Sequence, residues 1–176
     1  MKFNKKSILC FAAMLAVMML IFNFSSEDGI ASTGTSTGVT RLASRVLFSD
    51  YEKMQPEQQS FIVEGLQHFV RKLAHFSVYM LLGLFSYAAV LLSTEKLRYK
   101  WLLAVIICVS YAAVDEIHQL FVPGRTAKVT DVLIDGAGSI MGMLLLRIAI
   151  LCWIYFKNLI KNKNLIKNHK NLTEGR

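Results

Sequence analysis

Four long runs of apolar residues set the strongest limit on what this chain can fold into. They cover residues 7–24, 76–92, 101–121 and 132–156 of the 176. A helix needs about 20 residues to cross the hydrocarbon core of a bilayer, and these runs are of that order. Since 54% of the residues are hydrophobic and the apolar residues are not broken up at a short period, a soluble domain is disfavoured. The sequence predicts an all-α polytopic membrane protein, a bundle of four transmembrane helices.

The first run could also be a signal peptide, and the third is short for a membrane span. The first follows several lysines, as a signal peptide would, but its apolar core exceeds the usual length of about 7–15 residues and no small-x-small cleavage site follows it. An uncleaved anchor is therefore favoured. The third run reaches spanning length only if its helix continues through residues 115–119. That continuation would place Asp115 and Glu116 about 9 Å inside the end of the helix, at a rise of about 1.5 Å per residue.

The distribution of charge predicts how the chain is oriented. With four spans, one side of the membrane holds the N-terminus, the loop at 95–100 and the tail at 157–176, which together carry 12 Lys and Arg residues against 2 acids. The other side carries 7 against 10, and Arg147 lies inside the fourth run. Because basic loops stay in the cytoplasm, both termini are predicted to be cytoplasmic. The basic residues flank spans rather than forming one folded face, so the net charge of +8 does not indicate nucleic-acid binding.

The runs divide the chain into four predicted parts. These are an N-terminal anchor at 1–24, an external loop with interfacial helices at 25–70, a core of three spans at 71–156 and a basic cytoplasmic tail at 157–176. Within the external loop, residues 25–40 are rich in Ser, Thr and Gly, which is typical of a flexible segment. Residues 41–48 and 56–70 have the pattern of short amphipathic helices. The tail is expected to be frayed and to be attracted to anionic lipid.

Polar residues gather at one end of the last three runs. Those that enter the second run are Arg71, Lys72 and His75, those that leave the third are Asp115, Glu116, His118 and Gln119, and those that enter the fourth are Asp131 and Asp135. In membrane helices, all of them reach the same membrane face. A bilayer penalises a charge at a helix centre by roughly 2.5–3.5 kcal/mol, so this clustering indicates one site rather than scattered accidents.

The fourth run combines its carboxylates with a packing stripe. Steps of four, three and four residues join Asp131, Asp135, Gly138 and Gly142. Taken alone, the glycine pair is an ordinary small-xxx-small packing surface; aligned with the carboxylates, it is predicted to position them. The turn signal at residues 123–125 makes a short hairpin before this run. It would place Arg125 close to the polar residues and beside helix N-termini, where its guanidinium could bind phosphate or carboxylate.

The three cysteines and the histidines bear on metal binding. The cysteines lie in or beside apolar runs, with a spacing that fits neither a metal motif nor a disulfide framework: Cys10, Cys108 and Cys152. A metal site is an alternative, because imidazole and carboxylate groups suit zinc or iron. It would draw on His75, His118, and Asp115 or Asp131. Since no compact metal-ligand signature supports it, the sequence predicts no metal and no cofactor.

The polar segments also resemble a known family. Phe24-Ser25-Ser26, the stretch RKLAHFSVYMLLG at 71–83 and the stretch DEIHQLFVPGRTAKVTDVLIDGAGSIMG at 115–142 occur in the order found in the VanZ-like family of bacterial membrane proteins. The resemblance covers most of residues 20–145. It implies a multi-pass protein of the bacterial cell membrane, associated with lowered susceptibility to teicoplanin-type glycopeptides. The family's recurring positions fall here on Arg71, Lys72, His75, Asp115, Glu116, His118, Gln119, Pro123, Gly124, Arg125, Asp131, Asp135 and Gly138.

These observations lead to one functional hypothesis and its rivals. In the hypothesis, an outward-facing polar pocket binds an anionic envelope lipid or a lipid-linked cell-wall precursor. The ligand-binding residues are then Arg71, Lys72, Gln119, Arg125, Asp131 and Asp135. In an enzyme, acid–base chemistry on an envelope lipid would instead use His75, Asp115, Glu116 and His118. Further alternatives are an ion-paired lock that only holds the bundle together and a transporter, which four short spans disfavour.

Overall fold

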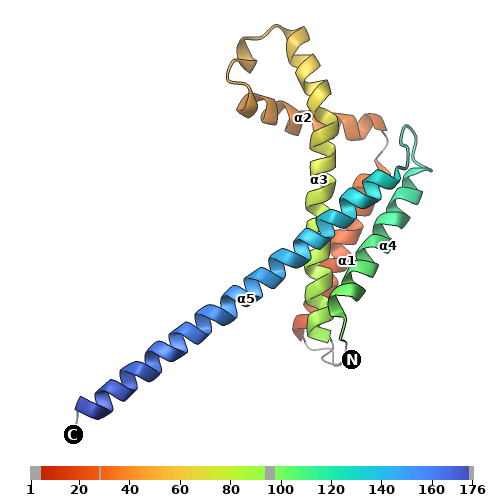
Figure 1. The fold of residues 1–176 in the computed structure, drawn as a ribbon. Coiled ribbons are helices and arrows are strands. Elements are labelled where there is room, and N and C mark those ends of the chain that lie inside the picture. Colours follow the sequence, from red (N-terminus) through yellow and green to blue (C-terminus); the bar gives the residue numbers. More distant parts are fainter. Residues whose placement is uncertain (1–4, 28, 94–97, 175–176) are drawn as a thin grey trace. The chain divides into compact units, whose positions relative to one another are not determined.

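A computed structural model describes residues 5–27, 29–93 and 98–174. Throughout these residues the regular structure is helical, as Figure 1 shows. The elements are α1 (Lys5–Ser26), α2 (Gly29–Leu47), the short 3-10 helix η1 (Tyr51–Lys53), α3 (Pro56–Ser93), α4 (Lys100–Gln119) and α5 (Val129–Glu174). The predicted all-α class is confirmed.

Four of these helices are long and apolar enough to cross a membrane. They are α1, α3, α4 and the Val129–Lys163 part of α5. The four predicted spans are therefore confirmed as helices of spanning length and composition. Helix α4 continues through Asp115 and Glu116 and ends at Gln119, so the acidic pair lies inside the helix, as its spanning length requires.

The segment that the sequence predicts to be a flexible loop is different in the structure. Residues 29–40 belong to α2, which is helical for 19 residues. Serine and threonine disfavour helices because their hydroxyls compete for backbone groups, but here the competition is resolved within the helix. Thr40 Oγ1 donates to the Ser36 carbonyl at 2.8 Å, and Ser44 Oγ donates to the Thr40 carbonyl at 2.9 Å. Both of these hydroxyls are satisfied one turn back, so neither interrupts the helix.

Two further predicted boundaries are absent. The interfacial helix at 56–70 and the second span are one unbroken helix, α3, of 38 residues. No proline follows Pro56 in this helix, and Gly65 alone costs only about 1 kcal/mol relative to alanine. The tail is also not frayed, because α5 continues for 46 residues to Glu174. Helix propagation is cooperative once a long span has formed, and the Lys and Leu residues of the tail are good helix formers.

The chain divides into two compact units, Met1–Met143 and Leu144–Arg176. The second unit is the continuation of α5, and its apolar side chains, including Trp153 and Phe156, are exposed together with Arg147. The first unit contains α1 to α4 and the start of α5. Exposed apolar residues there, such as Leu9 and Met19 on α1, have the pattern of lipid-facing side chains.

Small residues bring the helices of the first unit close together. Helix α4 buries Ala104, Cys108 and Ala112 at steps of four, which lets neighbouring helices approach this face closely. Helix α4 is also tied to α1, because the Tyr111 hydroxyl donates to the Met18 carbonyl at 2.5 Å. These contacts place the C-terminal ends of α1 and α4 together.

Glycines set the approach of α5 to α3. A Cβ added at Gly138 would collide with the Phe76 backbone, and one added at Gly142 would collide with the Met80 carbonyl. A Cβ at Gly83 of α3 would collide with the Ser139 backbone in the same way. The two helices therefore meet backbone to backbone, which brings the first turns of α5 against the middle of α3.

Candidate functional site

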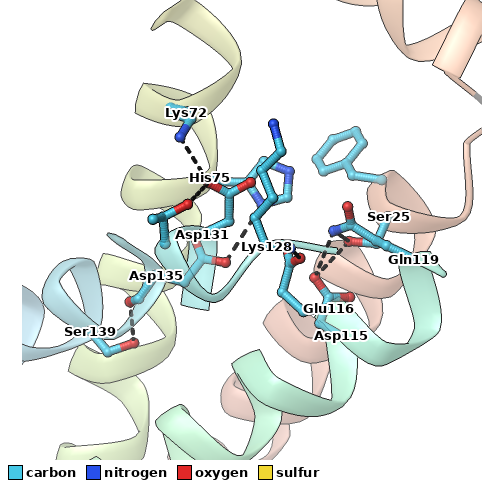
Figure 2. A network of polar contacts seen from close by, with 12 residues as sticks. Ser25, Lys72, His75, Asp115, Glu116, Gln119, Lys128, Asp131, Asp135 and Ser139 are labelled. Carbon is cyan, nitrogen blue, oxygen red and sulfur yellow. Dashed lines mark hydrogen bonds and ion pairs between the residues drawn. The ribbon is translucent and has the colours of Figure 1, made fainter. Parts of the chain in front are cut away.

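Polar side chains from four helices meet at the end of the first unit where α1 and α4 finish and α5 begins (Figure 2). The link between α3 and α5 is an ion pair in which Lys72 Nζ lies 2.8 Å from Asp131 Oδ1. Lys72 lies about one turn before Phe76 on α3, and Asp131 lies about two turns before Gly138 on α5, so the pair is next to the glycine contacts between these helices. The convergence that the spacing of polar residues predicts from separate spans is therefore present in the fold.

Asp115 lies at the contact between α4 and α1. Its side chain is 3% exposed, and its Oδ2 accepts a hydrogen bond of 2.8 Å from Ser25 Oγ. The amide of Gln119, one turn along α4, lies 3.4 Å from both Asp115 Oδ2 and Ser25 Oγ. This triad joins the ends of two helices, so Asp115 and Gln119 have a structural task in addition to any other role.

Glu116 closes the connection between α4 and α5. Its Oε2 accepts a hydrogen bond of 2.9 Å from the backbone N–H of Lys128, just before α5 begins. An acidic group at this place satisfies one of the backbone N–H groups that a helix start leaves without an intrahelical partner. Figure 2 shows Glu116 and Asp115 pointing to different sides of α4, toward Lys128 and Ser25 respectively.

Arg125 binds the end of α1. It follows Gly124, whose φ of 74° is in the left-handed region that favours glycine. The Arg125 side chain donates from Nε to the Glu27 carbonyl and from Nη2 to the Phe24 carbonyl, both at 2.9 Å. These carbonyls lie at a helix C-terminus, where basic side chains are stabilising. Burial, followed by the positive charge of Arg71, lowers the pKa of the Arg125 guanidinium.

His75 and Asp135 face each other across the contact between α3 and α5. Their Nδ1 and Oδ2 atoms are 3.9 Å apart, which is beyond hydrogen-bond distance. Asp135 is 1% exposed, and its Oδ2 accepts no hydrogen bond from the part of the chain that the structure describes. Its backbone carbonyl accepts from Ser139 Oγ at 3.1 Å. A buried carboxylate oxygen that accepts no hydrogen bond is unusual, because buried polar atoms are generally paired.

His118 lies on the opposite side, against α1. Its Nε2 is 3.1 Å from Ser26 Oγ, and its ring stacks on Phe22 with centroids 4.6 Å apart. Ser26 Oγ also donates to the Phe22 carbonyl at 2.7 Å. The two histidines that the sequence marks as acid–base candidates therefore belong to different surroundings, one beside Asp135 and the other beside α1.

A pocket of about 180 Å³ lies among these side chains. The candidate residues that line it are Arg71, Lys72, His75, Glu116, Gln119, Arg125, Asp131 and Asp135. Asp115 and His118 are not among the lining residues. Within the described residues, no three His, Cys, Asp or Glu side chains are placed to hold a metal ion. The pocket therefore offers charged and hydrogen-bonding groups, four of them Lys or Arg when Lys128 is included.

Sequence reasoning missed four residues here. His68 and Lys128 line the pocket, and Ser25 and Ser26 bind Asp115 and His118. His68 lies seven residues before His75, so helical spacing places both on one face of α3. The two serines belong to the Phe24-Ser25-Ser26 segment of the family resemblance, but the sequence does not show that they face α4.

Comparison with known proteins gives one family match. The VanZ/LLP1 family model matches residues 10–153. The chain belongs to the VanZ/LLP1 family. The match extends from α1 into α5 and contains every residue that lines the pocket. No curated protein and no solved structure matches the chain. The site of this VanZ/LLP1 protein is therefore described from its own geometry.

Proposed function

We propose that this protein lowers bacterial susceptibility to teicoplanin-type glycopeptides by binding the anionic headgroup of an envelope lipid or lipid-linked cell-wall precursor in the polar pocket. Membership of the VanZ/LLP1 family, over residues 10–153, supports a role in the membrane. The teicoplanin connection comes from the resemblance to VanZ-like proteins. The charge of the pocket supports an anionic ligand.

The main support is that Arg71 and Arg125 line the same pocket. After burial, the positive charge of Arg71 is the next cause of the lowered pKa of Arg125. An anion bound beside both guanidinium groups would offset the repulsion between their charges. Guanidinium groups bind phosphate and carboxylate through paired N–H donors, which makes either group a suitable headgroup.

Two other charged residues of the pocket lining have partners on neighbouring elements. Lys72 pairs with Asp131, and the Glu116 carboxylate accepts the backbone N–H of Lys128. In the proposed complex the ligand binds to Arg71 and Arg125, with Gln119 as a further hydrogen-bond donor.

We also propose that the pocket faces the exterior. Helices α1 and α4 begin at the opposite end, with Lys5 and Lys6 at the start of α1 and Lys100 at the start of α4. Basic residues at span ends favour the cytoplasmic side. This orientation would place both termini in the cytoplasm and the pocket toward the cell wall, where glycopeptides act.

The test compares Arg71→Gln with the matched control Arg45→Gln. Arg45 lies on α2 and pairs with the exposed Glu52. It lines neither the polar pocket nor the apolar pocket next to it, between α1, α2 and α3. At equal membrane levels, Arg71→Gln is expected to return teicoplanin susceptibility to that of cells without the protein, while Arg45→Gln keeps the wild-type susceptibility. Full protection by Arg71→Gln would refute the proposed anion site.

A second candidate function is catalysis on the bound lipid. The observation that favours it is the buried Asp135, whose Oδ2 lies 3.9 Å from His75 Nδ1 without a hydrogen bond. A carboxylate and an imidazole in this relation can act together as an acid–base pair on a ligand that lies beside them in the pocket. Asp135→Asn separates the two candidates, provided the variant is folded. If the variant still binds lipid but protection is lost and a lipid accumulates, catalysis is favoured. If protection is retained, binding alone is favoured.

A further inference from the structure

A second pocket lies directly beside the polar one. It encloses about 230 Å³ between α1, α2 and α3. Most of its wall is apolar and comes from Ile21, Phe24, Val39, Val70, Ala74 and Val78. Away from the shared border, its polar lining residues are Glu27, Ser36 and Tyr79. Because most of the wall is still apolar, its natural content is hydrocarbon.

The two pockets share a border made of three residues. Arg71, His75 and Arg125 line both of them. On α3 this follows from helical spacing, because Val70, Ala74 and Val78 recur at steps of four along one stripe, and Arg71 and His75 form the adjacent stripe. The lining of α3 therefore changes from apolar to cationic across one row of side chains, and the shared residues stand between the two adjacent pockets.

Helix α2 forms a fixed side of the apolar pocket. Gln67 of α3 donates from Nε2 to Ser36 Oγ and to Thr37 Oγ1, each at 3.1 Å. This holds α2 against α3 beside Val39, which is 59% exposed at the edge of the pocket. Phe24 on α1 is also exposed. A chain that leaves the pocket between them would continue into the surrounding lipid.

We propose that the apolar pocket holds the first part of the hydrocarbon chain of the same amphiphile whose anionic group sits in the polar pocket. This inference rests on the proposed function and names its ligand class. The ligand is a phosphate or carboxylate joined directly to a hydrocarbon chain, because the two pockets are adjacent and share Arg71 and Arg125 as lining residues. The polar pocket, of about 180 Å³, has room for a phosphate-sized group.

The test measures the binding of butyl, hexyl and octyl phosphate to the full chain in amphipol, without detergent. For the wild type, affinity is expected to increase by up to about fourfold per methylene until the pocket is filled, which is the equivalent of about 0.8 kcal/mol per buried CH₂. Ala74→Phe fills the apolar pocket and is expected to remove the dependence on chain length while butyl phosphate still binds. The matched control is Leu73→Phe, since Leu73 is exposed and lines neither pocket.

The outcomes separate this inference from the proposed function. If Ala74→Phe keeps the wild-type dependence on chain length, the hydrocarbon lies elsewhere and the inference is overturned, while the anion site stands. Two results would overturn the proposed anion site. One is that the wild type binds each alkanol as tightly as the matching alkyl phosphate. The other is that the Arg71→Gln variant binds the alkyl phosphates and the alkanols with the same affinities as the wild type.

A second measurement uses the wild-type chain and does not depend on a variant that folds. An octyl phosphate with a diazirine in mid-chain is bound and photolysed, and the labelled peptides are mapped. The inference predicts labels at Val39 or within residues 70–78, and competition by unlabelled octyl phosphate. Labels confined to the exposed face of α4, around Ile106 and Val114, would overturn it.

Discussion

Lys72 on α3 and Asp131 on α5 form an ion pair at the rim of the polar pocket, with 2.8 Å between Nζ and Oδ1 and side chains 30% and 28% exposed. The partners are 59 residues apart in the chain. Their pairing joins the middle of one helix to the first turn of another. The pocket wall therefore depends on a tertiary contact and not only on the helices themselves.

The Lys72–Asp131 pair should behave as a coupled unit. Exposed pairs contribute about 0.2–1 kcal/mol, and this pair is less exposed, so we expect a coupling energy of about 1 kcal/mol. The measurement is a double-mutant cycle of Lys72→Gln and Asp131→Asn on the unfolding free energy in detergent. Additive effects of the two substitutions would contradict a direct ion pair.

The approach of α5 to α3 should tolerate no side chain at Gly142. Gly142→Ala places a Cβ against the Met80 carbonyl, and overpacking of this kind costs about 1–3 kcal/mol. Gly65→Ala on α3 is the control, because its Cβ would meet nothing within 4 Å. It should stabilise the helix by about 0.8–1 kcal/mol. Thermal unfolding that ranks Gly142→Ala at or above the wild type would show that the backbones are not in contact.

The bond from Ser25 to Asp115 should be important for stability. Ser25→Ala removes the 2.8 Å hydrogen bond to a carboxylate that is almost fully buried, and a buried polar group left without its partner costs about 1–3 kcal/mol. Ser77→Ala is the comparison, since Ser77 Oγ donates only to its own helix, at the Leu73 carbonyl. The unfolding temperature should fall clearly for the first variant and little for the second. Equal effects would be evidence against the contact between α1 and α4.

Arg125 should not be replaceable by lysine. Two separate nitrogens of its guanidinium reach the Phe24 and Glu27 carbonyls, and a lysine ammonium on a flexible stem cannot reproduce this fork. Because a hydrogen bond to a charged group contributes about 1.5–3 kcal/mol, Arg125→Lys should lose about 2 kcal/mol of unfolding free energy although the charge is kept. A lysine variant as stable as the wild type would mean that charge alone matters at this position.

The sequence predicts the spans well, because a run of apolar residues long enough to cross a bilayer has few alternative structures. The positions of Arg71, Lys72 and His75 just before or at the start of the apolar part of α3 follow from the same argument. Gly138 and Gly142 predict the close approach of another helix, and the structure shows that this helix is α3, at Phe76 and Met80.

Other features could not be predicted because they depend on tertiary contacts. Composition indicates a flexible segment at residues 29–40. The structure has a helix there, in which the Thr40 hydroxyl donates one turn back and Gln67 of α3 donates to Ser36. Spacing on α4 places Asp115 and His118 on one face. It does not show that this face meets Ser25 and Ser26 of α1 and not the pocket.

The central claim is that the polar groups of separate helices form one pocket open to the exterior. The most direct test replaces the three cysteines with alanine and introduces a single cysteine at Thr126, which lines the polar pocket, or at Tyr99, an exposed residue next to the start of α4. A membrane-impermeant thiol reagent is then applied to intact cells. The account predicts labelling at position 126 in intact cells and at position 99 only after permeabilisation. Labelling in the reverse pattern would contradict it.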